Sequence, residues 1–403
     1  MESAITSDPF LVAKNHLLEL TRRFPPNTVP AQVIENVASS HLEWPVWPDE
    51  GLANLVGPPN ILLKNLNLLW LHRFRATVGV LDWLSDQLGG PKGGPSALSL
   101  VVERAPLLGF RGWGSISAGG SCRILTTADT PIALNLPRED DMRSVPAWLN
   151  SSVEGNDWAL IKEVVRERGS RELVDRGKLL GIPVSLIGET KPPSAQLDLF
   201  GGEAKFTGPP TVVDLSSMWA GPLCSWYLMR CGAHIVKIES VHRPDGTRKG
   251  SELFHRRLNE GKSIVALDFN DPQDVRQLHS LIRGADIVIE GSRPRALEQL
   301  GVNAMEEVSR GAIWCSITGH GRFSEPLRVG FGDDAAAAAN LLAEVDEQLW
   351  FIGDAIADPI TGALAAVLVM GHWLANSSAL LDVGLSPTAA AHSQGLRSHG
   401  RLF

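Results

Sequence analysis

From Thr211 to Ile317 the sequence alternates between short apolar runs and segments with helix signals. Runs rich in Val and Ile favour buried parallel strands, and the segments between them end at glycines typical of helix C-termini. The five expected strands are Thr211–Leu215, His234–Glu239, Ser263–Leu267, Asp286–Glu290 and Ala312–Ile317. Because strands alternate with helices of about ten residues, this pattern predicts an α/β fold with a Rossmann-like parallel sheet domain.

The rest of the chain predicts a second, smaller α+β domain and a helical region. Residues 1–95 carry apolar side chains at helical spacing, chiefly between Ile61 and Leu88. Residues 96–190 contain Gly119 and Gly120, then a hairpin pattern and further helices. The Pro- and Gly-rich residues 191–206 predict a linker to the Rossmann-like domain at 207–382. Residues 383–403 lack periodicity, and we expect a loosely ordered tail there.

Composition excludes several classes of function. A net charge of −8 argues against nucleic-acid binding, because phosphate contacts need a basic face. Four cysteines without a C-x-x-C pair, and no histidines at ligand spacing, predict neither a metal site nor a disulfide framework. No G-x-G-x-x-G follows a strand, so no nicotinamide or flavin site is expected. The N-terminus lacks a signal-peptide pattern, and the apolar run Ala363–Ala375 is too short for a membrane span. We therefore expect a cytoplasmic protein without membrane partners.

One carboxylate is placed for chemistry. Asp358 precedes Pro359 and a long apolar run, which predicts that it caps the N-terminus of a buried helix. The positive end of a helix favours the ionised form of a carboxylate. An ionised, partly desolvated Asp can attack an activated acyl group. The same local pattern also fits a cap without any chemical role.

The surroundings of Asp358 resemble a known family. Ordered blocks precede it: Val212–Pro222, Leu228–Glu239, Asn259–Asp268, Ala285–Pro294 and Ser316–Gly321. In order and spacing they resemble the family III CoA-transferases, the CaiB/BaiF group that includes formyl-CoA:oxalate CoA-transferases and shares a superfamily with α-methylacyl-CoA racemases. The resemblance covers residues 210 to 375. It implies transfer of CoA from an acyl-CoA donor to a carboxylic acid acceptor. Asp358 would be the nucleophile, and the intermediates would be an aspartyl anhydride and an aspartyl-CoA thioester.

The resemblance also implies a set of site residues, with CoA bound as a substrate and not as a permanent cofactor. Gly119 and Gly120 would supply backbone N–H groups and shield the anhydride, although a simple turn before a strand explains them equally well. The residues expected to bind CoA are Met218, Trp219, Ala220, Ser240, Arg243, Lys262, Leu267 and Arg293. Each cation among them also fits an ordinary solvated surface charge.

The resemblance further implies an interlocked homodimer and an unusual domain order. The small domain follows the sheet half in most family members but precedes it here, so we expect a permuted order with the parts still meeting in space.

Two alternatives stay open. Racemases pair the catalytic Asp with a His–Asp step, and Gly332-Asp333-Asp334 puts Asp333 at the His position, where a helix N-cap is the simpler interpretation. A CoA-binding paralogue without turnover is the third interpretation. It is favoured by Trp219 where some transferases have Gln, and by Ser240 where a basic residue is frequent.

Overall fold

The computed structural model describes residues 8–40, 50–57, 68–193, 198–204 and 206–394. Its centre is a seven-stranded sheet with the order β4-β12-β9-β8-β5-β6-β7. All neighbouring strands are parallel except the edge pair β4 and β12. The strands are β4 Leu199–Glu203, β5 Thr211–Leu215, β6 His234–Ser240, β7 Ser263–Leu267, β8 Ile287–Glu290, β9 Ile313–Thr318 and β12 Ser377–Gly384. The predicted α/β class with a mainly parallel sheet is confirmed.

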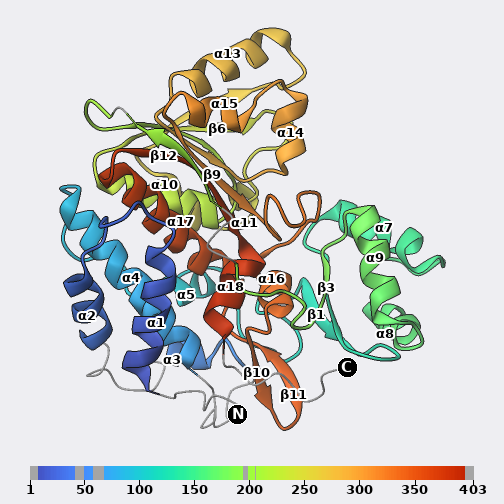
Figure 1. Ribbon diagram of the computed structural model, residues 1–403. Coiled ribbons are helices and arrows are strands. Elements are labelled where there is room, and N and C mark those ends of the chain that lie inside the picture. The colour runs from blue at the N-terminus through green and yellow to red at the C-terminus, as the bar shows by residue number, and fades with distance from the viewer. Residues whose placement is uncertain (1–7, 41–49, 58–67, 194–197, 205, 395–403) are drawn as a thin grey trace.

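Side chains alternate between the two faces of this sheet. Val213, Val288 and Trp314 lie in the core under α13 (Pro272–Arg283), α14 (Pro294–Gln299) and α15 (Ala304–Ser309). Val212 and Ile313 point to the other face, which is covered by α10 (Ala220–Arg230) and α17 (Ala357–Leu374). Figure 1 shows the two helical layers on opposite sides of the strands. Burial on both faces explains why these strands are continuous apolar runs.

The N-terminal helices extend the core on the α17 side. They are α1 Pro9–Thr21, α2 Ala31–Ser40, α3 Glu50–Ala53, α4 Leu69–Gln87, α5 Ala97–Val102 and α6 Ala105–Leu108. Leu17 and Leu81 share one apolar cluster with Val367 of α17, so residues of the expected helical region pack directly on the sheet domain. Residues 61–67 of that region lie outside the described residues.

A smaller α+β unit packs beside the sheet domain (Figure 1). Its antiparallel strands are β1 Cys122–Leu125, β2 Ile132–Asn135 and β3 Val184–Leu186, and its helices are α7 Glu139–Leu149, α8 Trp158–Arg166 and α9 Ser170–Leu180. It has an apolar core of its own. Cys122 and Ala133 also pack against Ala337 of α16 (Gly332–Ala338), which joins the unit to the sheet domain. The remaining elements are α11 Thr247–Gly250, α12 Glu252–Asn259, β10 Leu342–Val345 and β11 Gln348–Phe351.

Two predictions about which segments lack regular secondary structure are wrong. Leu199–Glu203, inside the expected linker, forms the edge strand β4. The expected tail from residue 383 is buried as far as it is described: it completes β12 and forms α18 (Leu385–Ser393). A helix buried nearly all round shows no amphipathic periodicity, so α18 gave no signal in the sequence. Residues 395–403 lie outside the described part of the chain.

The apolar run from Ala363 belongs to a helix that begins at Ala357. α17 has 18 residues and could cross a membrane by length and composition alone, but 89% of it is buried inside the molecule. It is the central core helix, contacting α10, α4, β12 and α18.

Candidate active site

Asp358 lies in the first turn of α17, although it is not the cap. Ile356 is the N-cap residue, Ala357 is the first helical residue and Asp358 is the second. Ala355 adopts φ +45°, and its carbonyl already accepts the Asp358 N–H at 2.8 Å. The helix therefore begins two residues before the position that the Asp-Pro pair predicts. The predicted capping role is wrong, and the placement at the positive end of the helix remains.

Backbone from two other elements presses against the Asp358 carboxylate. A Cβ added to Gly332, at the start of α16, would lie 2.3 Å from Asp358 Oδ2. The N–H of Ala220, at the start of α10, donates a hydrogen bond to the Asp358 carboxylate and lowers its pKa. The side chain is nevertheless only half-buried, so a small reactant can reach it. The site thus combines tight backbone contact with an open side.

A guanidinium and two more carboxylates surround Asp358. Arg104 binds Asp354 through two parallel hydrogen bonds, Nε to Oδ2 at 2.7 Å and Nη2 to Oδ1 at 2.5 Å. Asp333 accepts the N–H of Ala355 at 2.9 Å, which places it against the turn that leads to Asp358. The Arg104 guanidinium lies 4.7 Å from the ring centroid of Trp219, the residue before Ala220. One cation therefore faces three carboxylates.

Burial dominates the electrostatics of this cluster. Desolvation raises the pKa of Asp358 to about 7, Arg104 opposes the rise, and the like charges of Asp333 and Asp354 add to it. Desolvation likewise raises the pKa of Asp333 to about 6, with a further contribution from Asp354. The pKa of Asp358 therefore moves opposite to the direction expected for a carboxylate at a helix N-terminus, because desolvation by burial is the largest contribution. Near neutral pH the carboxyl is poised between its two protonation states.

The glycine pair lies near this cluster. Gly120, at φ +79°, closes a tight turn by donating its N–H to the Ser117 carbonyl at 2.8 Å. A Cβ on Gly119 would touch the ring of Phe110, which itself lies 5.9 Å from the Arg104 guanidinium. Ser117 hydrogen-bonds to Asp333 and so links the loop to the acidic cluster. The loop thus adjoins the carboxylate next to Asp358, through Ser117 and not through the glycines themselves.

The turn from Met218 to Ala220 contributes backbone more than side chains. Met218 has φ +71°, a strained value for a residue with a side chain, and its N–H is held by Asp245 at 3.1 Å. Trp219 is fully buried and packs edge-to-face on Phe254, with ring centroids 5.0 Å apart. Trp219 therefore forms a wall behind the site, and its ring is not free to contact CoA. Met218 is 36% exposed and remains at the surface.

Lys262 is not a surface cation, which contradicts its expected contact with CoA. Its side chain is fully buried, and Nζ donates to Ser225 at 2.7 Å and to the Pro222 carbonyl at 3.0 Å, and contacts Asp214 at 3.3 Å. Lys237 is buried in the same way and donates to the Ser216 carbonyl at 2.8 Å. The two ammonium groups hold opposite ends of the turn that carries Trp219 and Ala220.

The other expected CoA residues divide into two groups. Leu267 is 2% exposed and packs in the core on the α13 side, so its side chain is not available to a nucleotide. Ser240 is half-buried at the end of β6, and Arg243 follows it on the surface. Arg293 is exposed just after β8. These three lie at the carboxyl ends of parallel strands, the edge where such sheets bind ligands.

Arg104 and Asp354 were not predicted as site residues from the sequence. Arg104 lies between α5 and α6, outside the residues that carry the family resemblance, and no motif surrounds it. Asp354 stands four residues before Asp358, a spacing that places two carboxylates one helical turn apart. That spacing was the available signal, but the chain is not yet helical at Asp354.

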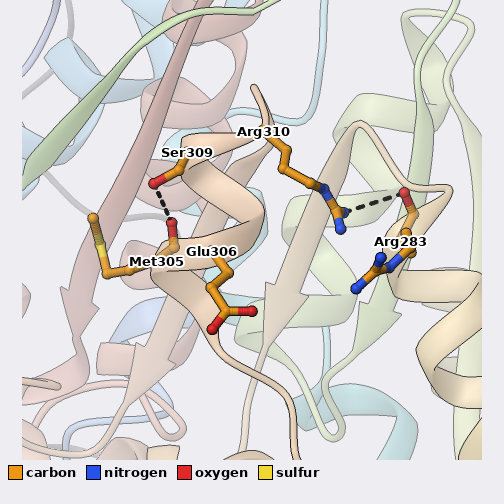
Figure 2. A pocket seen from close by; sticks show the side chains of 5 residues that line it. All are labelled: Arg283, Met305, Glu306, Ser309 and Arg310. Atoms are coloured by element: carbon orange, nitrogen blue, oxygen red, sulfur yellow. Dashed lines mark hydrogen bonds between the residues drawn. The ribbon is translucent and has the colours of Figure 1, made fainter.

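The two cavities whose linings are described lie away from Asp358. Figure 2 shows the larger, of about 410 Å³, which is lined by Arg283, by Met305, Glu306 and Ser309 of α15, and by Arg310 just after that helix. The second, of about 350 Å³, adjoins Glu203 and Asn376. Arg283, Arg310 and Asn376 precede β8, β9 and β12, so both cavities lie at the amino ends of the parallel strands. Among the described residues, no group of three His, Cys, Asp or Glu is arranged to hold a metal ion.

Comparisons with known proteins concentrate on the sheet domain. Residues 210–378 match the model of CoA-transferase family III. The Homo sapiens succinyl-CoA:glutarate CoA-transferase is 30% identical over 137 residues, covering 32% of this chain and 31% of the relative. The Agrobacterium fabrum succinate–glutarate CoA-transferase is 28% identical over 201 residues, covering 43% and 50%. The chain thus spans between a third and a half of the length of these relatives.

Among solved structures, a CaiB/BaiF family protein from Brucella suis aligns with a TM-score of 0.42 and 24% identity, over 48% of this chain and 56% of that one. The family match itself includes Asp358, Gly332 and the Ala220 turn. Residues 210–378, which carry these parts of the site, therefore match CoA-transferase family III.

Proposed function

We propose that this protein transfers CoA from an acyl-CoA donor to a carboxylic acid acceptor, with Asp358 as the nucleophile. The observation that carries the proposal is the setting of Asp358 inside the matched segment: a half-buried carboxylate in the first turn of α17, touched by Gly332 and by the N–H of Ala220. Such a group is desolvated enough to be reactive and open enough to be reached.

The reaction has two halves. The Asp358 carboxylate attacks the thioester carbonyl of the donor and displaces CoA thiolate, which leaves an acyl-aspartyl anhydride. The thiolate then attacks the aspartyl carbonyl, releases the donor acid and leaves an aspartyl-CoA thioester. The acceptor carboxylate reverses both steps and departs as the new acyl-CoA. Attack on the aspartyl carbonyl forms an oxyanion on Asp358, and the Ala220 N–H, which donates to this carboxylate, is a donor that would stabilise it.

The pKa of Asp358 predicts how the rate of the first half of the reaction depends on pH. The nucleophile must be deprotonated, and its pKa is raised to about 7 by desolvation. The rate of adduct formation should therefore rise with pH through about 7. A bound CoA ester brings no positive charge to the carboxylate, so the rate should still increase with pH when the substrate is bound.

Mass spectrometry of the intact protein tests the proposal. Incubation with a panel of acyl-CoAs, starting from the succinyl-CoA named for the human relative, should add CoA to Asp358, and hydroxylamine should release it. Asp358→Asn should lose the adduct. Asp334→Asn is the matched control, because Asp334 is a buried carboxyl held by Asn135 at 2.7 Å. An adduct that persists in Asp358→Asn would show that another residue is the nucleophile.

A racemase is the second candidate, and one observation favours it. Asp333 and Asp358 adjoin each other, with desolvation raising their pKa values to about 6 and about 7. Two such carboxyls can exchange a proton on either side of an α-carbon. Deuterium incorporation into a 2-methylacyl-CoA, without CoA transfer, would select this activity. Retention of CoA with neither reaction would instead identify a binding paralogue.

We also propose that the small α+β unit completes the site in a permuted order. Asn135 donates to Asp334 of α16 at 2.7 Å, and the Gly188 N–H donates to the Ala337 carbonyl at 3.1 Å. These contacts support a joint role of residues 96–190 with the matched segment, which they precede in the chain. The homodimer and the cytoplasmic location remain predictions, testable by sedimentation and by fractionation of cells.

A further inference from the structure

Arg104 uses only part of its hydrogen-bonding capacity. Nε and Nη2 are both bound to Asp354, whose side chain is fully buried. Among the described residues Nη1 has no hydrogen-bond partner, and it does not belong to the fully buried polar atoms. The Arg104 side chain keeps 15% of its surface exposed. One amino group of the guanidinium can therefore reach a ligand.

The Arg104 guanidinium belongs to the same cluster of charges as the carboxylate proposed to react. The guanidinium stacks on Trp219, whose neighbour Ala220 donates to Asp358, and Asp354 begins the turn that carries Asp358. The two groups are close enough for each to shift the pKa of the other. Aromatic rings on several sides fix the cation, since Phe110 and Phe254 lie 5.9 Å and 6.0 Å from it. Its geometry is therefore set before any ligand arrives.

An acceptor acid meets an electrostatic problem at this site. Its carboxylate must come within bonding distance of the aspartyl thioester at Asp358, yet the neighbouring carboxylates of Asp333 and Asp354 repel an anion. Arg104 is the cation among these groups, and Asp354 neutralises it only in part while Nη1 is unoccupied. A charge-assisted hydrogen bond from Nη1 would offset the repulsion and orient one carboxylate oxygen.

We infer that Arg104 binds the reacting carboxylate of the acceptor acid through Nη1 and aims its other oxygen at the aspartyl thioester. This inference rests on the proposed function and extends it to a residue outside the matched segment. The free carboxylate oxygen attacks the thioester carbonyl of the aspartyl-CoA, and the C–S bond breaks with CoA thiolate as the leaving group. The thiolate then attacks the acyl carbonyl of the anhydride and frees the Asp358 carboxylate. Arg104 donates hydrogen bonds throughout and loses no proton.

The test separates the KM for the acceptor acid from the KM for the acyl-CoA. With succinyl-CoA and glutarate, or with whichever panel donor and acid the wild-type protein accepts, Arg104→Met should raise the acceptor KM by about tenfold or more, as expected for loss of a hydrogen bond to a charged group. The KM for the acyl-CoA should change by less than about threefold, because a thioester carries no carboxylate at that position. Arg104→Lys should give an intermediate acceptor KM, since an ammonium lacks the planar fork that serves Asp354 and a ligand together.

Three controls make the result decisive. Arg230→Met removes another arginine stacked on a tryptophan, 4.8 Å from the Trp226 centroid and outside the site, and should leave both KM values unchanged. Asp354→Asn keeps the charge of Arg104 and should raise the acceptor KM less than Arg104→Met does. Arg104→Lys keeps a cation beside Asp354, so this variant provides the test of the acceptor KM if Arg104→Met fails to fold. An acceptor KM that is unchanged in Arg104→Lys, or that moves in parallel with the acyl-CoA KM, would overturn the inference. A wild-type protein that forms no CoA adduct would overturn the proposed function itself.

Discussion

Replacing Asp358 by Asn should make the protein more stable at alkaline pH while it abolishes CoA transfer. Desolvation raises the pKa of Asp358 from 3.8 to about 7, so ionising the folded protein is harder than ionising the unfolded chain. Between these two values the folded state holds the proton more tightly, and the wild-type protein loses stability as pH rises. One pKa unit corresponds to about 1.36 kcal/mol, so above pH 7 the free energy of unfolding of the wild type is lower by about 4 kcal/mol.

Asn removes the charge and keeps an oxygen for the Ala220 N–H, so little else changes. In urea titrations at pH 8, the free energy of unfolding of Asp358→Asn should therefore exceed that of the wild type by about 4 kcal/mol. At pH 4.5 the difference should be only about 1 kcal/mol, because Asp358 is still protonated in the folded wild-type protein and this pH lies only slightly above its pKa in the unfolded chain. Asp175→Asn, at an exposed position on α9, is the matched control and should show a much smaller effect at either pH.

The pH dependence is what distinguishes this explanation from a general effect of the substitution. A variant that is no more stable than the wild type at pH 8 would mean that the Asp358 carboxylate is well hydrated. The same result would remove the physical basis for its reactivity. Equal stabilisation at both pH values would point to packing and not to charge.

Further changes around the site have distinct expected outcomes. Lys262→Met should lower the free energy of unfolding by about 3 to 5 kcal/mol, because it removes the ammonium group that contacts the buried Asp214 carboxylate. Lys249→Met, on the surface, should change it by less than about 0.5 kcal/mol in the same urea titration. Gly332→Ala should slow adduct formation by about 100-fold, since its Cβ would lie 2.3 Å from Asp358 Oδ2 and displace the nucleophile; a normal single-turnover rate would contradict this. Asp333→Asn removes a like charge and should lower the pKa of Asp358, so the rise of adduct formation with pH should move to lower pH; a move to higher pH would refute the assigned sign.

Much of the sheet domain could be predicted from local pattern. The central strands β5, β8 and β9 are apolar runs because both faces of the sheet are covered there, and the glycines that follow the helices mark their ends. β12 and α18 could not be predicted in this way, because α18 is buried nearly all round and lacks an amphipathic period. β4 was missed for the opposite reason: all five residues of this edge strand are exposed, and the segment has the composition of a linker.

The features of the site likewise divide into those that local sequence pattern predicts and those that depend on tertiary packing. Asp358 could be found because its Asp-Pro context and the blocks before it are local features of the chain. Whether Asp358 caps the helix depended on the backbone of Ala355, and whether Lys262 faces solvent depended on what packs over it. Neither property is encoded in the neighbouring residues.

Local sequence patterns predict the alternation of strands and helices and the position of the carboxylate proposed as the nucleophile, because backbone preference and hydrophobic period act over a few residues. Only the tertiary structure brought Arg104 from the N-terminal part of the chain, 250 residues away from Asp354, onto the carboxylates of the sheet domain. It also decided their protonation, since the pKa of a carboxyl depends on the water excluded and the charges gathered by the whole fold.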